Sequence, residues 1–135
     1  MTESPGTADV LLAALPFAAH LDIRLPEATP ARTIATLGWS PDYCTAGGIL
    51  HGGALMTLAD TAGAVCAHLQ LPQGAGTATV ESKTNFFRPL ASGTARAVAR
   101  PLHVGRSFVV VQTDVYDDED RLLGQTTQTQ AVRHG

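Results

Sequence analysis

The chain has 135 residues, of which 44% are hydrophobic and 16% are charged. This length suits a single domain, and the low charged fraction argues against a largely disordered chain. The formal net charge of −3 and the pI of about 5.9 argue against a nucleic-acid-binding protein, because such proteins present a basic face. Two cysteines, and no cysteine–histidine cluster at zinc-ligand spacing, favour neither a disulfide framework nor a metal site.

The N-terminal part predicts one helix and two short strands. Its segments, in chain order, are a loose start over residues 1–6, a helix over about 7–17 with Thr7 as its cap, and extended segments over about 21–25 and 31–39, interrupted by Pro26 and Pro30. No basic segment precedes the short apolar stretch near the start, so a signal peptide is not expected and the predicted location is cytoplasmic.

A long helix is predicted from about Gly52 to Leu69. Its apolar residues lie on every side, which is typical of a buried helix rather than of a surface helix. The apolar run over 53–71 is about long enough to span a bilayer. However, Asp60 lies near its middle, where a carboxylate costs roughly 2.5–3.5 kcal/mol on insertion scales. A buried helix of a soluble protein is the better interpretation.

The C-terminal half predicts four strands joined by turns, at 77–87, 94–103, 106–116 and 122–132. Links this short make neighbouring strands antiparallel. Period two places four residues of the third strand on one face: Val109, Val111, Thr113 and Val115. Three alanines of the second strand share a shallow face on which a helix could lie: Ala95, Ala97 and Ala99. The predicted fold is α+β, a single domain with an antiparallel sheet of about five or six strands wrapped around one long central helix.

Asp60 is the residue that most needs an explanation. It is a lone carboxylate in an apolar helix, and aspartate is a mediocre helix former that is rarely buried without partners. Burial and hydrogen bonds tune such a carboxylate for a role as base or nucleophile. The alternative is a structural aspartate that accepts hydrogen bonds from a neighbouring backbone or subunit.

The His51-Gly52-Gly53 turn lies at the start of the same helix. Free N–H groups at a helix N-terminus, without side chains at two successive positions, form a site for negative charge. They could stabilise the oxyanion formed when a thioester or ester carbonyl is attacked. The alternative is an ordinary tight turn before a helix.

Helix geometry constrains how these two features act together. Gly52 and Asp60 are eight residues apart, about 12 Å of helix rise, whereas attack requires contacts of about 3 Å. One carbonyl cannot reach both groups of the same chain. If both act on one substrate, the chain is a homodimer with two sites, each combining the turn of one subunit with Asp60 of the partner subunit.

Two segments carry a resemblance to a known family. Residues 51–68, HGGALMTLADTAGAVCAH, resemble the phenylacetate-pathway (PaaI-like) type of hotdog-fold acyl-CoA thioesterase, and residues 85–90, NFFRPL, resemble a strand end of that family. The order of elements is similar over essentially the whole chain. The resemblance implies hydrolysis of acyl-CoA, without metal or redox cofactor, by a homotetramer built from two dimers.

The resemblance also implies roles for individual residues. Asp60 would attack the carbonyl or activate water, the N–H of Gly52 would polarise the carbonyl, and His51 would lie near the thioester. A hydroxyl on the first strand after the helix is matched by Thr79 or, alternatively, Ser82. The sequence departs from the family pattern at two positions, where relatives have asparagine and threonine: Thr45 and Ala64.

The residues that would bind the substrate and CoA are expected in the turns. The stretch His103-Val104-Gly105-Arg106-Ser107 offers a glycine, a guanidinium and a hydroxyl suited to phosphate contact. Arg88 and Lys83 could add positive charge, and Gly53 and Thr45 complete the predicted set. The alternative is a solvated hairpin turn with ordinary surface arginines. Glu81 is expected to face solvent.

Two other functions remain open. The first is a non-hydrolytic acyl-CoA-binding protein of the same fold, supported by the departure at Thr45. The second is a hydratase or dehydratase acting on an acyl-thioester, which needs an acid–base pair that usually includes a histidine. Only His51 is placed for that chemistry, and it lies in a turn. The few aromatic residues do not distinguish an aryl from an aliphatic acyl group.

Overall fold

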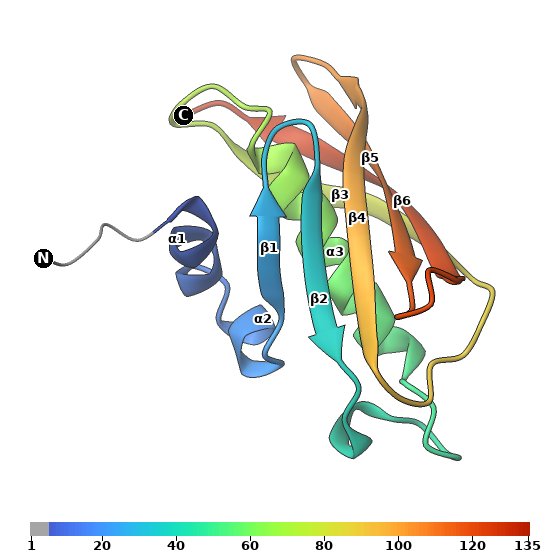
Figure 1. The fold of residues 1–135 in the computed structure, drawn as a ribbon. Helices are drawn as coiled ribbons and strands as arrows, with labels where there is room; N and C mark the ends of the chain where they lie inside the picture. Colours follow the sequence, from blue (N-terminus) through green and yellow to red (C-terminus); the bar gives the residue numbers. More distant parts are fainter. Residues whose placement is uncertain (1–5) are drawn as a thin grey trace, which may run out of the picture.

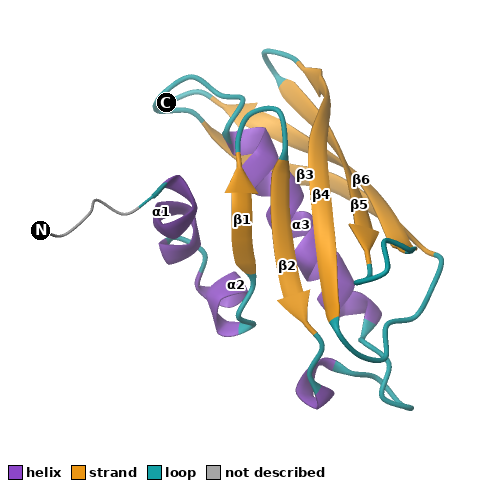
Figure 2. Ribbon diagram, viewed as in Figure 1, coloured by secondary structure: helices purple, strands orange, loops and turns teal. Residues whose placement is uncertain are grey.

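The computed structural model describes residues 6–135, so most of the predicted loose start lies outside the described residues. Figures 1 and 2 show a strongly curved sheet around one long helix, with two short helices beside the first strand. The elements, in chain order, are α1 (Thr7–Ala13), α2 (Pro16–His20), β1 (Arg24–Ala28), β2 (Thr33–Gly38), a 3-10 turn (Pro41–Tyr43), α3 (Gly52–His68), β3 (Gly76–Phe86), β4 (Thr94–Val104), β5 (Phe108–Tyr116) and β6 (Leu122–Arg133).

All six strands form one antiparallel sheet in the order β1-β2-β4-β5-β6-β3. The predicted α+β architecture is therefore confirmed. The two ends of the sheet differ. The edge strand β1 contains Pro26, which has no N–H to donate, and α1 packs against it. The other edge strand, β3, pairs only with β6, so one of its sides has no partner within residues 6–135.

The core lies between α3 and the concave face of the sheet. The helix contacts all six strands. As predicted from period two, Val109, Val111, Thr113 and Val115 of β5 are buried, and the three alanines of β4 are buried against the helix. Small side chains at these positions let the helix axis lie close to the sheet. Cys66, on the same helix, is buried as expected.

One face of α3 is exposed, which corrects the prediction of a helix buried on every side. The sheet curls around the helix, but its two edges do not meet, and the face between β1 and β3 stays open to solvent in the single chain. The exposed or half-buried positions recur once per helical turn, singly or as adjacent pairs: Gly53, Met56, Thr57, Asp60, Thr61, Ala64 and His68. Asp60 is thus exposed and not buried. No helix within residues 6–135 is long and apolar enough to cross a membrane.

The N-terminal helix was predicted as one segment, and this is wrong. Two helices replace it, because the residue before a proline is sterically kept out of the helical conformation. Leu15, with φ −121° and ψ 75°, interrupts the helix, and Pro16 begins α2. Gly6, not Thr7, is the N-cap of α1, and it makes no side-chain capping bond.

The link between β3 and β4 was predicted to join neighbouring strands, and this is also wrong. The two strands lie in different parts of the sheet, because the link docks on the loops that flank β2 and α3. The N–H of Trp39 donates to the carbonyl of Gly93, and the N–H of Leu50 donates to the carbonyl of Leu90, each at 2.8 Å. These bonds direct β4 to β2.

Candidate active site

Asp60 lies in the open face of α3, beside the inner face of β6. Its Oδ1 accepts a hydrogen bond of 3.1 Å from Nε2 of Gln128. A hollow of about 320 Å³ adjoins the carboxylate and is lined by residues of α3 and β3: Met56, Thr57, Asp60, Thr79 and Ser82. The structure therefore brings Asp60 together with both hydroxyl candidates.

A β-bulge explains why Thr79 and Ser82 share this hollow. In a regular strand, residues three apart point to opposite faces of the sheet. In β3, Thr79 pairs with Gln130 and Glu81 pairs with Thr129, so Val80 is an extra residue without its own partner in the register. The bulge shifts the alternation by one residue. Both hydroxyls consequently face α3.

The turn at the start of α3 has one capped and one free N–H group. The N–H of Gly53 donates to Nδ1 of His51 at 2.8 Å, so His51 is the N-cap and the neutral ring carries its proton on Nε2. The next two amides, of Ala54 and Leu55, donate to the carbonyl of His51. The N–H of Gly52 donates to no atom within residues 6–135. Of the two glycines, Gly52 therefore offers the free donor.

Gly52 lines a second hollow, of about 340 Å³, together with Phe86 at the end of β3 and residues that follow it, among them Phe87 and Arg88. A Cβ at Gly52 would lie 3.3 Å from two carbons of the Phe86 ring, so this glycine lets the ring pack close to the helix terminus. Because α3 is continuous from Gly52 to His68, the predicted separation of about 12 Å between Gly52 and Asp60 holds within one chain.

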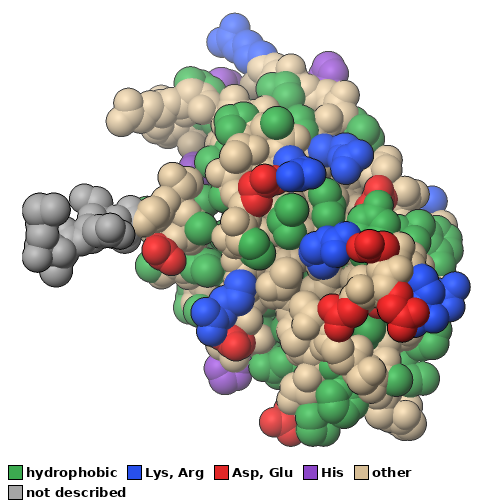
Figure 3. All heavy atoms as spheres, in the orientation of Figure 1, with side chains coloured by type: hydrophobic (Ala, Val, Ile, Leu, Met, Phe, Trp, Pro, Cys, Tyr) green, Lys and Arg blue, Asp and Glu red, His purple; other side chains and the backbone are tan. Residues whose placement is uncertain are grey.

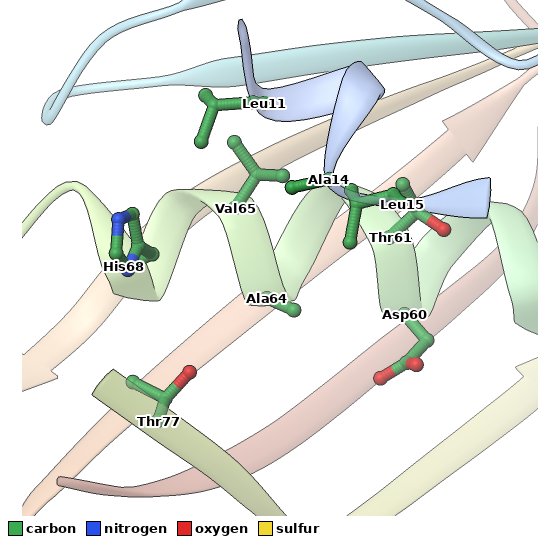
Figure 4. A pocket seen from close by; sticks show the side chains of 9 residues that line it. All are labelled: Leu11, Ala14, Leu15, Asp60, Thr61, Ala64, Val65, His68 and Thr77. Carbon is green, nitrogen blue, oxygen red and sulfur yellow. The ribbon is translucent and has the colours of Figure 1, made fainter. Parts of the chain in front are cut away.

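A larger hollow, of about 370 Å³, lies over the same open face toward the C-terminus of α3 (Figure 4). It is mostly apolar and is lined by Leu11, Ala14, Leu15, Asp60, Thr61, Ala64, Val65, His68 and Thr77. In Figure 4 Leu11 of α1 lies on one side of α3, and the carboxylate of Asp60 points to the other side, where Thr77 lies. The carboxylate thus lines both this hollow and the smaller one.

The residues predicted to contact CoA do not gather in one place. Arg88 lies just after β3, near Gly52, whereas Gly105, Arg106 and Ser107 form the turn between β4 and β5 at the opposite end of the sheet. The register places these two ends at Gly124 and Ala131 of β6, about 23 Å apart along the strand. Within one chain, Arg88 and Arg106 cannot bind the same phosphate.

The remaining predicted residues are exposed and lie in two places. Thr45 lies in the loop before α3, where its N–H donates to the carbonyl of Ile49 at 2.8 Å. Lys83 and Glu81 are exposed on β3, as expected for Glu81. Figure 3 shows acidic and basic side chains interspersed on one face of the molecule, without a basic patch there. Within residues 6–135 no group of three or more histidine, cysteine, aspartate or glutamate side chains is arranged to hold a metal ion.

The sequence did not identify the glutamines of β6. Gln128 and Gln130 are buried on the inner face of the sheet, and Nε2 of Gln130 donates to Oγ1 of Thr79 at 2.7 Å. Their spacing by two within a predicted strand put them on one face, but glutamine is usually exposed, so nothing marked that face as the inner one.

Known proteins resemble this chain in sequence and in fold. Residues 47–123, which include both α3 and β3, match the model of the thioesterase superfamily. The chain belongs to the thioesterase superfamily. ComA2 of Bacillus subtilis, which bears an esterase name, is 31% identical over 113 residues, covering 83% of this chain and 90% of that protein. The 1,4-dihydroxy-2-naphthoyl-CoA hydrolase of Escherichia coli is 33% identical over 85 residues, covering 63% of this chain and 62% of that protein.

The solved structures give the same family. The thioesterase HI1161 of Haemophilus influenzae superposes with a TM-score of 0.89 at 26% identity, covering 98% of this chain and 93% of that one. The predicted hotdog fold is thereby confirmed, and thioester hydrolysis is supported as the general activity.

Proposed function

We propose that this protein hydrolyses acyl-CoA thioesters to a carboxylic acid and CoA, with Asp60 as the reacting carboxylate. The observation that carries the proposal is that one helix presents both the accessible carboxylate of Asp60 and the free N–H of Gly52, in a member of the thioesterase superfamily. Water is the only co-substrate, and the proposal includes no metal or redox cofactor.

Asp60 would act in one of two ways. As a general base it takes a proton from water, whose oxygen attacks the thioester carbonyl carbon. As a nucleophile it attacks that carbon itself, and water then hydrolyses the resulting anhydride. In both cases the C–S bond breaks, the CoA sulfur leaves as a thiolate that takes up a proton, and the acyl group leaves as the carboxylic acid. Thr79 or Ser82 would hold the water by hydrogen bonds.

The N–H of Gly52 would stabilise the oxyanion. It lies at the positive end of the α3 dipole and is not used by any other acceptor within residues 6–135. His51 keeps Gly53 capped and, as the residue next to Gly52, would line the path of the thioester. Since Gly52 and Asp60 are about 12 Å apart in one chain, each site would take Gly52 from one subunit and Asp60 of the partner subunit.

The free edge of β3 supports a dimer. An eleven-residue edge strand with an unpaired side invites pairing with another chain. Large apolar side chains are exposed on or beside it: Met56 at 39%, Val80 at 60%, Phe86 at 52% and Phe87 at 55%. Such a cluster marks a protein–protein interface. A second copy lying along β3 would cover these side chains and the open face of α3. A dimer of two such dimers is the assembly we propose, in the cytoplasm.

The hollows suggest where the parts of the substrate lie. The apolar hollow of about 370 Å³ is within the range of small-molecule sites and would hold the acyl group beside Asp60. Arg88, next to Gly52, would contact a CoA phosphate. The turn containing Arg106 could contact the same CoA only from the other subunit.

Thiol release from benzoyl-, phenylacetyl- and fatty acyl-CoA, followed with a thiol-reactive chromophore, tests this function. We expect turnover on at least one of these substrates and its loss in Asp60→Asn and Asp60→Ala, with CoA binding retained. Wild-type protein that binds acyl-CoA but releases no thiol would instead be a binding protein. Enoyl-CoA consumed without thiol release would indicate a hydratase. Wild-type turnover by Asp60→Ala would refute the role of the carboxylate.

A further inference from the structure

Gln128 is the buried side chain that contacts the candidate carboxylate. It lies on the inner face of β6, is fully buried, and donates from Nε2 to Oδ1 of Asp60 at 3.1 Å. No other side chain within residues 6–135 makes a hydrogen bond to Asp60. Asp60 is exposed on the helix, whereas Gln128 is buried in the sheet, so the bond ties an exposed carboxylate to a buried side chain of β6.

Gly63 provides the space that Gln128 occupies. A Cβ at Gly63 would lie 2.0 Å from Oε1 and 2.6 Å from Cδ of Gln128. Any side chain there would displace the amide. Glycine in the middle of a helix is less favourable than alanine. The close approach of the Gln128 amide is therefore the structural reason for a glycine three residues after Asp60.

The other end of the amide has no compensating bond. Oε1 of Gln128 is buried and has no hydrogen-bond partner within residues 6–135. A buried carbonyl without a donor destabilises the fold relative to an apolar side chain of the same size. Rotating the amide would not help, because it would turn the carbonyl oxygen toward the carboxylate of Asp60. Of the two ends of the Gln128 amide, only Nε2 has a hydrogen-bond partner among residues 6–135, and that partner is Asp60.

We infer that Gln128 is a positioning residue, which holds the carboxylate of Asp60 by a hydrogen bond and aims it into the hollow shared with Thr79. The inference rests on the proposed role of Asp60 as the reacting carboxylate. Gln130 repeats the arrangement two residues further on, where it donates to Thr79. Two side chains of the inner face of β6 thus orient the Asp60 carboxylate and the Thr79 hydroxyl.

Gln128→Met is the first test, because methionine keeps the length and the burial but has no N–H to donate. We expect kcat to fall about tenfold, which corresponds to about 1.4 kcal/mol of activation free energy, with KM changed less than about twofold. The thermal midpoint should stay level or rise.

Gly63→Ala tests the same contact from the helix. In the presence of Gln128 it should displace the amide and lower kcat about as much as Gln128→Met does. In a Gln128→Ala protein the space is already empty, so adding Gly63→Ala should change kcat by less than about twofold. A purely structural role for Gln128 gives no reason for this dependence.

The matched control is Gln125→Met. Gln125 lies on the same strand and also donates to an aspartate, Oδ1 of Asp114, at 2.9 Å, but on the outer face of the sheet. Its kcat and KM should equal those of the wild type. If Gln128→Met is folded and keeps the wild-type kcat while Asp60→Asn is inactive, the positioning role is wrong and the proposed function stands. If Asp60→Asn is itself active, the proposed function fails first.

Discussion

Gly52 is a position where one backbone N–H can be removed while the fold is kept. It is the first residue of α3, and proline is favoured at that position of a helix because the N–H there has no intrahelical acceptor. The preceding residue must be extended, and His51 already is, with φ −60° and ψ 135°. Gly52→Pro therefore deletes the proposed oxyanion donor and little else.

The expected loss follows from measured oxyanion sites. Removing one such donor lowers kcat by about 10²–10³, or about 2.7–4 kcal/mol of transition-state stabilisation. Stability should change little, because the Gly52 N–H donates to no atom within residues 6–135. The nearest new contact is with the Phe86 ring, 3.3 Å from the Cβ position. Gly52→Ala introduces the same contact and keeps the N–H, so it is the control.

The assay is thiol release under saturating acyl-CoA, with circular dichroism and thermal melting to verify folding. Gly52→Ala should keep most of the wild-type kcat, and Gly52→Pro should lose at least 99% of it. A folded Gly52→Pro protein with more than about a tenth of the wild-type kcat would show that this N–H does not stabilise the oxyanion, since one lost donor accounts for much more.

The same variant tests whether sites are shared between subunits. Gly52→Pro and Asp60→Asn should each be inactive alone. After random exchange of subunits, about half of the dimers are mixed, and each mixed dimer has one of its two sites intact, so about 25% of the wild-type activity should return. No recovery in a mixture shown to contain mixed dimers would mean that Gly52 and Asp60 do not act on one carbonyl.

Three further predictions concern the interface, the acyl pocket and acid stability. Val80→Lys, on the free edge of β3, should yield monomers by light scattering and abolish thiol release. Leu102→Lys also replaces an exposed apolar side chain, but this variant should stay assembled and active. Ala64→Phe should fill the apolar hollow and lower kcat/KM for dodecanoyl-CoA at least tenfold more than for butyryl-CoA. Although burial opposes the shift, hydrogen bonds and the ion pair from Arg121 lower the pKa of Asp117. The ionised carboxylate therefore stabilises the fold at pH 7. This stabilisation should be lost as the pH falls below the ordinary pKa of an aspartate and through the lower pKa of Asp117 in the folded protein. Urea unfolding should distinguish Asp117→Asn from wild type only at higher pH.

The elements with strong local patterns could be predicted from the sequence. The four C-terminal strands and α3 were placed to within two residues, because their apolar periodicity is long and their ends carry turn residues. The shallow alanine face of β4 also predicted correctly where the helix would lie. Gly52 and Asp60 were placed on one helix about 12 Å apart for the same reason, since a continuous helix converts sequence separation directly into distance.

Features that depend on contacts between distant segments could not be predicted. The apolar composition of α3 indicated burial on all sides, but the open face results from the two sheet edges failing to meet, which no local pattern records. The link between β3 and β4 was mispredicted for a similar reason, because its length resembles that of a hairpin. Its direction is set by bonds such as Leu50 to Leu90, over forty residues of sequence.

The bulge at Val80 shows why the candidate site itself was only partly predictable. Strict alternation makes Thr79 and Ser82 exclusive alternatives, one on each face of β3, and the resemblance favoured Thr79 with Ser82 as the alternative. The extra residue in the register turns the alternatives into neighbours, and the pairing of Thr79 with Gln130 and of Ser82 with Gln128 joins both to β6. The polar inner face of β6 therefore has a definite cause: its two buried glutamines face the part of β3 where the bulge brings two hydroxyls next to Asp60.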